Sequence, residues 1–357
     1  MPELPDHPRT THASAPRVRT LLGFAAISTF AITSLGVPAA QASEPASLLA
    51  ATGSACVRVI PEGTSIFDVA FEGESFAVRV HVPDAPVHRS LPLVLDLHGS
   101  NNNATTQADI SDLESLADAE GFIVATPTGD IAFPQTLPDG NWAWNVPGVP
   151  LTSGTYPPAG SRDDVGFLTA VVDQLDTAGC IDDRRVYATG FSGGGRMASA
   201  LACDASDVFA AIAPVAGLRA GRPDAADLTK PEAGTCNPEH PVSVLTFHGT
   251  DDFVNPYKGN ADPRWGYTVQ TAASTWASLN ECRVGPTTTS VSESVVAYSW
   301  TECAARADVV LYEVAGGGHT WPDTDVPLDA FGLGTVTHEI NASSLMWDFF
   351  EAHPRRG

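Results

Sequence analysis

Short apolar runs without polar alternation recur along the chain from Leu91 onward. They are LPLVLDLHG (91–99), GFIVATPTG (121–129), RRVYATGFS (184–192), FAAIAPVAG (209–217), PVSVLTFHG (241–249) and DVVLYEVAG (308–316). Runs of this kind are typical of strands that are buried on both faces, as in parallel sheets. Upstream, residues 67–83 have the pattern of two strands around the turn Glu72-Gly73-Glu74, which predicts a hairpin.

Stretches with a helical pattern lie between these runs. They cover residues 105–121, 162–179, 193–206 and 338–353. Alternating β and α elements predict an α/β fold, with a mostly parallel central sheet and helices on both faces. In such sheets ligands bind beside the carboxyl ends of the strands. Polar signatures follow several of the apolar runs directly, so we expect them to cluster at that edge.

The first segment has a different pattern. Residues 1–20 carry three arginines, residues 21–37 are uncharged and mostly apolar, and small residues lead up to Ala42. This order is typical of a secretory signal peptide at 1–42, followed by a mobile lead-in at 43–55. The apolar run is shorter than the roughly 20 residues that cross a bilayer, which favours secretion over a membrane anchor. The expected location is extracellular or periplasmic.

The cysteines fit an oxidising compartment. All six follow the predicted cleavage point, and none forms a C-x-x-C pair, so the pattern favours three disulfides over a zinc or redox site. Proximity in the sequence favours two of the pairs, and the third pair is the remainder. The expected pairs are Cys203 with Cys236, Cys282 with Cys303, and Cys56 with Cys180.

Composition narrows the classes of partner. Hydrophobic residues make up 43% of the chain, enough for a large core, and the formal net charge is -23. That charge repels phosphate backbones and anionic lipid surfaces, so we expect no nucleic acid partner and no membrane association after signal cleavage. Residues 56–357 contain no repeat and no linker to a second module, which predicts a single catalytic domain.

The segment 190–194 (GFSGG) matches the pattern G-x-S-x-G between a predicted strand and a predicted helix. In this turn the serine is exposed above the sheet, and the crowded flanking positions require glycine. Ser192 is therefore the predicted nucleophile. A phosphate-binding loop is the alternative, but the stretch lacks the G-K-[ST] sequence and has Arg196 in place of the lysine.

A serine hydroxyl needs a base and an acid that orients the base, in the chain order Ser, acid, His. His319 follows the last apolar run within GGGHTWP and is the predicted base. His240, His338 and His353 have less suitable positions. Asp251 and Asp252 both follow the run that ends near residue 249, and spacing alone leaves either as the acid.

Other polar residues have weaker assignments. Ser100 and Gly193 are the predicted backbone donors of the oxyanion hole. Arg162-Asp163-Asp164 opens a predicted helix, where carboxylates satisfy free N–H groups, so we expect a structural role there. The long insert at 130–161 contains Trp142 and Trp144, whose rings would suit an aromatic acyl group, a sugar face or plain packing.

Taken in order, LHGSNNNA, DDVGFL, RRVYATGFSGGG, APVAG, HGTDDFVNPY and GGGHTWP resemble the polyhydroxybutyrate depolymerase-like esterases, a family that includes feruloyl and acetylxylan esterases. The resemblance covers about residues 56 to 354 and implies an α/β-hydrolase fold. The family pattern H-G-T-x-D-x-x-V-P-Y implies Asp252 as the acid, and Trp321 would line the substrate pocket. Asn255 and Gly193 depart from the family pattern.

The expected activity is hydrolysis of carboxylic esters through an acyl-enzyme on Ser192, with no metal or organic cofactor. The expected substrate is a polysaccharide-linked ester or a hydroxyalkanoate oligomer. Two alternatives remain from other classes. One is a serine peptidase of the same fold, which would cleave an amide, and the other is a catalytically inactive binding domain.

Overall fold

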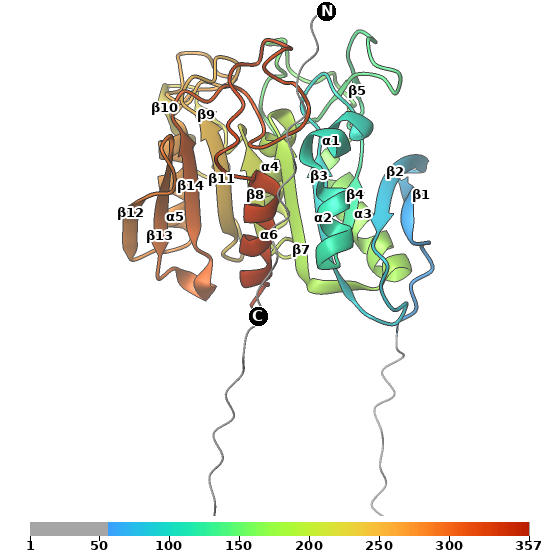
Figure 1. Cartoon of the computed structure of the whole chain (residues 1–357). Helices are drawn as coiled ribbons and strands as arrows, with labels where there is room; N and C mark the ends of the chain where they lie inside the picture. Colours follow the sequence, from blue (N-terminus) through green and yellow to red (C-terminus); the bar gives the residue numbers. More distant parts are fainter. Residues whose placement is uncertain (1–55, 357) are drawn as a thin grey trace, which may run out of the picture. The chain divides into compact units, whose positions relative to one another are not determined.

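The computed structural model describes residues 56–356 (Figure 1). The signal peptide predicted at 1–42 and the lead-in predicted at 43–55 lie outside these residues. No helix of the described part is long and apolar enough to cross a membrane. The described residues fall within one compact unit.

A large central sheet runs through the described residues. Its strand order is β1-β2-β4-β3-β7-β8-β11-β14-β13-β12. The six strands from β4 to β14 pair in parallel, and the two strands at each edge are antiparallel. The strands are β1 Gly63–Phe71, β2 Glu74–Val82, β3 Leu91–Leu97, β4 Ile123–Thr126, β7 Ile181–Phe191, β8 Ala211–Val215, β11 Ser243–Gly249, β12 Val284–Ser290, β13 Val295–Thr301 and β14 Val309–Val314.

Helices cover both faces of this sheet, as the alternating pattern predicts. One hydrophobic cluster packs α3, α4 and α5 against one face, and a second packs α1, α2 and α6 against the other. In Figure 1 the second group lies in front of the sheet. The helices are α1 Ala104–Ser111, α2 Leu113–Glu120, α3 Asp164–Gly179, α4 Gly193–Asp204, α5 Val269–Leu279 and α6 Ala342–Ala352, with a 3-10 turn at Ala304–Arg306.

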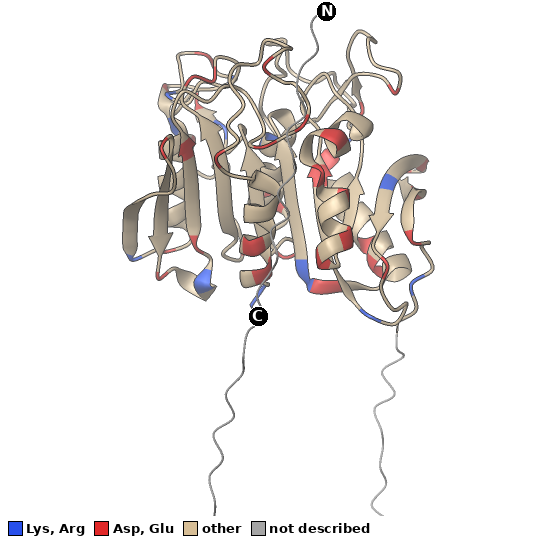
Figure 2. Cartoon of the chain, in the orientation of Figure 1, with Lys and Arg blue, Asp and Glu red and all other residues tan. Residues whose placement is uncertain are grey.

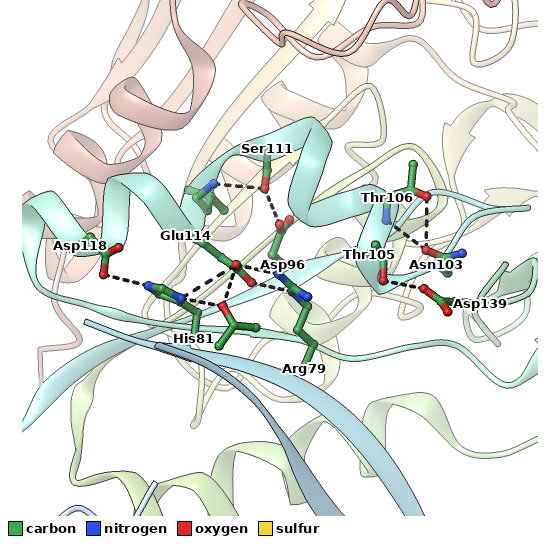
Figure 3. A network of polar contacts seen from close by, with 12 residues as sticks. Arg79, His81, Asp96, Asn103, Thr105, Thr106, Ser111, Glu114, Asp118 and Asp139 are labelled. Atoms are coloured by element: carbon green, nitrogen blue, oxygen red, sulfur yellow. Dashed lines mark hydrogen bonds and ion pairs between the residues drawn. The ribbon is translucent and has the colours of Figure 1, made fainter. Parts of the chain in front are cut away.

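The segment predicted as helical at 105–121 is divided into two helices. Asp112 has a left-handed backbone conformation (φ 49°) that ends α1 and begins α2. Directly before it, the Ser111 hydroxyl donates to the buried carboxylate of Asp96, 2.6 Å away (Figure 3). The Ser111 hydroxyl oxygen also accepts the N–H of Leu113 at 3.4 Å, a local bond to the backbone that competes with regular helical hydrogen bonds where the chain turns.

The elements not predicted from the sequence lie mainly at one edge of the sheet. They are α5 and the antiparallel strands β12 and β13. The insert at 130–161 adds a short ladder, β5 (Ile131–Ala132) with β6 (Trp142–Ala143), while β9 (Pro223–Asp224) pairs with β10 (Asp227–Pro231). Disulfides join Cys203 to Cys236 and Cys282 to Cys303, the two pairs that sequence proximity favoured, and Cys56 to Cys180, the pair left as the remainder.

Candidate active site

Ser192 lies in a strained turn between β7 and α4. Its backbone has φ 54° and ψ -110°, a region that a residue with a side chain rarely adopts. The surrounding glycines are required by space, since a Cβ atom at Gly190 or Gly194 would collide with the backbone oxygen of Leu97. Ser192 is 7% exposed, and its N–H donates to Val215 O at 2.8 Å, which fixes the turn on the neighbouring strand.

The structure brings His319 to Asp252. His319 Nδ1 lies 2.7 Å from Asp252 Oδ2, and both side chains are buried. The imidazole also lies against Phe191, the residue before Ser192, with ring centroids 4.9 Å apart. With Nδ1 held by the carboxylate, Nε2 is left to accept a proton from a hydroxyl group. Ser192, Asp252 and His319 follow the carboxyl ends of β7, β11 and β14, where the sequence analysis expected polar residues to gather.

Asp251 has a different environment. Its carboxylate is exposed, and within residues 56–356 it accepts one side-chain hydrogen bond, from the Thr250 hydroxyl at 3.4 Å. The Asp252 carboxylate is buried, and its Oδ1 accepts the N–H groups of Val254 (2.9 Å) and Asn255 (2.8 Å). The geometry therefore distinguishes the two neighbouring carboxylates, which spacing alone could not.

His248 is a residue of this site to which the sequence analysis assigned no role. Its Nε2 lies 3.2 Å from Asp252 Oδ2 and 2.8 Å from Asn255 O, and the side chain is completely buried. Burial alone would raise the pKa of the Asp252 carboxyl, but hydrogen bonds from His248 and His319 hold that pKa well below its ordinary value. The signal was present in the sequence, because His248 opens the same HGTDD segment that contains Asp252.

We expect His248 to support catalysis through the hydrogen bond that its Nε2 donates to Asp252. His248→Leu should lower kcat/KM by about tenfold, because Asp252 loses a donor that fixes its carboxylate. His248→Gln, whose amide can donate from a similar position, should recover most of this loss. Equal losses in the two variants would show that His248 only fills space.

Ser100 and Gly193 face each other across the top of β3 and β7. A Cβ atom placed on Gly193 would lie 2.9 Å from Ser100 N and would collide with the Ser100 hydroxyl. The two backbone N–H groups therefore belong to residues in close contact beside Ser192. His98 holds this loop: its Nδ1 bonds to Gly99 O at 2.8 Å and its Nε2 accepts the N–H of Gly129 at 2.9 Å.

The burial of His98 fixes its protonation state. Desolvation lowers the pKa of its imidazole to about 4, so the ring is neutral at pH 7, with a donor at Nδ1 and an acceptor at Nε2. This arrangement matches the two hydrogen bonds that it makes.

The close approach of Gly193 gives a test of the oxyanion hole. Gly193→Ala should reduce kcat by about 10², because the new methyl group displaces Ser100 and its N–H from the position of the oxyanion. Ser100→Ala keeps the N–H and should stay within about threefold of wild type in kcat. A large loss in Ser100→Ala, measured with the same ester, would mean that the hydroxyl is the donor.

The three tryptophans predicted to bind substrate have unequal positions. Trp321 is 1% exposed and donates from Nε1 to Ser343 Oγ at 3.1 Å, while Trp144 is 2% exposed and donates to His98 O at 2.8 Å. Both pack in the core, which makes them poor candidates for substrate contact. Trp142 is half-buried and pairs with Asn102, so it remains a proposed contact.

The segment Arg162-Asp163-Asp164 has a structural role. Asp163 caps α3, accepting the N–H of Gly166 at 3.2 Å. Asp164 is buried and forms an ion pair with Arg162 at 2.6 Å, and it accepts the N–H of Asn145 at 2.7 Å. These contacts tie the insert at 130–161 to the start of the helix. Within residues 56–356, no group of three or more His, Cys, Asp or Glu side chains is placed to hold a metal ion.

Comparisons with known proteins identify the family of this chain. A sequence model of the family described as "Esterase PHB depolymerase" matches residues 75–230. "Putative esterase NocK" of Nocardia uniformis subsp. tsuyamanensis is 31% identical over 306 residues, which cover 80% of this chain and 82% of that protein. "Feruloyl esterase B" of Piromyces equi is 29% identical over 66% of this chain, and the chain spans only 40% of its length.

Among solved structures, the acetyl xylan esterase from Aspergillus awamori superposes on this fold. Its TM-score is 0.51 at 17% sequence identity, covering 76% of this chain and all of that one. At 17% identity this similarity shows a shared fold, and that fold is the α/β-hydrolase fold. The chain belongs to the polyhydroxybutyrate depolymerase-like and feruloyl esterase family, and it is a carboxylic ester hydrolase of the serine hydrolase type.

Proposed function

We propose that the chain is a secreted esterase that hydrolyses carboxylic esters in two steps through an acyl-enzyme on Ser192. The observation that carries the proposal is the buried hydrogen bond between His319 and Asp252 beside the strained turn of Ser192. In this assignment Ser192 is the nucleophile, His319 the base and then the acid, and Asp252 the residue that orients the imidazole.

The first step acylates the enzyme. Ser192 Oγ attacks the ester carbonyl carbon while His319 Nε2 takes the hydroxyl proton, and the carbonyl oxygen becomes an oxyanion. The backbone N–H groups of Gly193 and Ser100 stabilise that charge. The carbon–oxygen bond to the alcohol then breaks, and the proton on His319 goes to the leaving alcohol. In the second step water loses a proton to His319, attacks the acyl carbon and releases the acid, which restores Ser192.

Three observations support secretion. The described residues contain three disulfides, which persist in oxidising compartments. The sequence of residues 1–42 has the order of a signal peptide. The large negative charge suits a soluble extracellular enzyme. Amino-terminal sequencing of the protein from the culture medium should begin at Ser43, and an uncleaved Met1 would contradict this proposal.

The names of the relatives support two candidate substrate classes. The names feruloyl esterase and "Bifunctional acetylxylan esterase/xylanase XynS20E", the latter from Neocallimastix patriciarum, favour a polysaccharide-linked ester. The family description favours a hydroxyalkanoate oligomer as the other choice. We propose the polysaccharide-linked ester as the first candidate, with half-buried Trp142 at the rim of the site as its contact.

The test measures release of ferulate, acetate and 3-hydroxybutyrate from matched model esters by the mature chain, with Ser192→Ala as the blank. A burst of alcohol equal to the enzyme concentration, before steady turnover, would mark the acyl-enzyme. A matched amide distinguishes the peptidase alternative, which predicts amide cleavage at a rate comparable to the ester. Ester hydrolysis that survives in Ser192→Ala would overturn the mechanism.

A further inference from the structure

Two arginines near the proposed active site are buried without a carboxylate partner. Arg196 lies on α4, one helical turn after Ser192, and is 4% exposed, while Arg219 follows β8 and is 6% exposed. Arg196 donates from Nη2 to Pro150 O at 3.1 Å, and its Nε has no acceptor among residues 56–356. Arg219 donates to Leu218 O and to Asn255 Oδ1, both of them neutral oxygens. Buried charges are normally paired, so these two require an explanation.

The neighbouring charges do not neutralise Arg196. Arg222 is paired with Glu232 and Arg264 with Asp262, both at the end of the sheet where Figure 2 shows several basic residues near β9 and β10. Burial, together with repulsion from Arg219, lowers the pKa of the Arg196 guanidinium to about 9, which still leaves it charged at pH 7.

Both arginines line one cavity. The enclosed part is small, with about 30 Å³ that the centre of a water-sized sphere can reach, and the total of about 360 Å³ of empty space includes open solvent. The floor is the face of α4 formed by Arg196, Ser199, Ala200, Cys203 and Asp204. Apolar residues of the insert, Val146, Pro147 and Val149, form one wall. Asp204 is the one carboxylate in this lining, two turns of helix beyond Arg196. Arg222 also lines the cavity, but its guanidinium is paired with Glu232. The lining thus combines the unpaired Arg196 and Arg219 with an apolar wall.

We propose that this cavity binds a small carboxylate whose apolar body packs on the insert, with Arg196 and Arg219 as the cationic partners. A planar guanidinium matches the two oxygens of a carboxylate, and the apolar wall disfavours a fully hydrated dianion such as phosphate. The choice of carboxylate rests on the proposed function, because ester hydrolysis releases an acid that is ionised at neutral pH. The cavity would then hold an acid product, or an acidic group of the substrate, apart from Ser192.

The cavity is separate from the proposed triad but linked to it. Neither Ser192 nor His319 lines it. Arg219 reaches the acid through Asn255, since Arg219 Nη2 donates to Asn255 Oδ1 at 2.7 Å and Asn255 N donates to Asp252 Oδ1 at 2.8 Å. Variants of Arg219 would therefore disturb the proposed acid, and Arg196 is the better residue to change.

Calorimetric titration of Ser192→Ala tests the proposal without turnover. Sodium acetate and sodium ferulate should bind, while sodium chloride at the same ionic strength and inorganic phosphate should not. The double variant Ser192→Ala/Arg196→Met should bind the acids about tenfold or more weakly than Ser192→Ala, because charge-assisted hydrogen bonds are lost. Methyl ferulate, which is neutral and would enter the active site, should bind equally with and without Arg196. Arg283→Gln, which removes an exposed arginine elsewhere, is the matched control and should change nothing.

The outcomes separate the two proposals. Acid binding that persists in Arg196→Met, or equal binding of chloride and phosphate, would overturn the carboxylate site. If wild type hydrolyses no ester but acetate still binds in an Arg196-dependent way, the proposed function fails and the site stands. Methionine is apolar and similar in length to arginine, so thermal unfolding of Arg196→Met without ligand should match or exceed wild type. Arg196→Lys, which keeps the charge but loses the fork, should bind the acids at an intermediate strength.

Discussion

Asp252→Asn should lower kcat for ester hydrolysis by about 10⁴, the scale of loss seen when an asparagine replaces the orienting aspartate of a serine hydrolase. The asparagine fits the same space, but it can present an N–H to His319, and the ring then turns its proton toward Ser192 instead of accepting one. The Val254 and Asn255 N–H groups that Asp252 Oδ1 accepts remain in place, so the fold should survive.

Asp251→Asn is the control for this prediction, since it makes the same chemical change one residue earlier. Its carboxylate is exposed and does not contact His319, so kcat should stay within about threefold of wild type. Both variants should be compared by kcat with one ester and by thermal unfolding. A large loss in Asp251→Asn with wild-type activity in Asp252→Asn would reverse the assignment of the acid.

The two neighbouring aspartates also show which site residues a sequence can identify and which it cannot. Ser192 is identifiable because its chemistry requires a local pattern, small residues two positions before and after a serine between a strand and a helix. The acid has no such local requirement. Asp251 and Asp252 differ only in the direction of their side chains, which the turn after β11 decides. The family pattern favoured Asp252, and the hydrogen bonds agree.

Burial explains the other differences. The sequence suggested substrate contact for Trp144 and Trp321. The residue type alone does not distinguish a tryptophan in a pocket from one in the core, and both of these side chains are buried in the core. The sequence assigns no role to His248 for a related reason, since that role depends on a contact with Asp252, which lies in the turn after β11. The parallel strands were predictable because burial on both faces leaves long apolar runs. By contrast, β12 is exposed along its whole length and carries no such signal.

The network in Figure 3 contains a buried carboxyl group outside the proposed catalytic machinery. Asp96 is completely buried in β3, where Gln107 Nε2 donates to Oδ1 at 2.7 Å and Ser111 Oγ donates to Oδ2 at 2.6 Å. Burial raises the pKa of this carboxyl from 3.8 to about 7, more than the two hydrogen bonds lower it. Its protonation should therefore affect stability between about pH 4 and pH 7.

The direction follows from proton binding. Between pH 4 and pH 7 the unfolded chain has lost this proton and the folded chain keeps it, so the free energy of unfolding falls as pH rises. This loss of stability is complete near pH 7 and amounts to at most about 4 kcal/mol, from the difference between the folded and unfolded pKa values of Asp96. Asparagine resembles the protonated acid, because it can accept from Gln107 and donate to the Ser111 hydroxyl, and it does not ionise.

Asp96→Asn should therefore have nearly the Tm of wild type at pH 4 and a Tm about 5–10 °C higher at pH 8. The comparison between the two proteins at each pH cancels the other titrating groups, including Asp252, whose depressed pKa acts in the opposite direction. Asp139→Asn removes an exposed carboxylate of the same network and should show no gain that grows with pH. A constant difference in Tm at every pH would mean that Asp96 remains ionised in the folded protein.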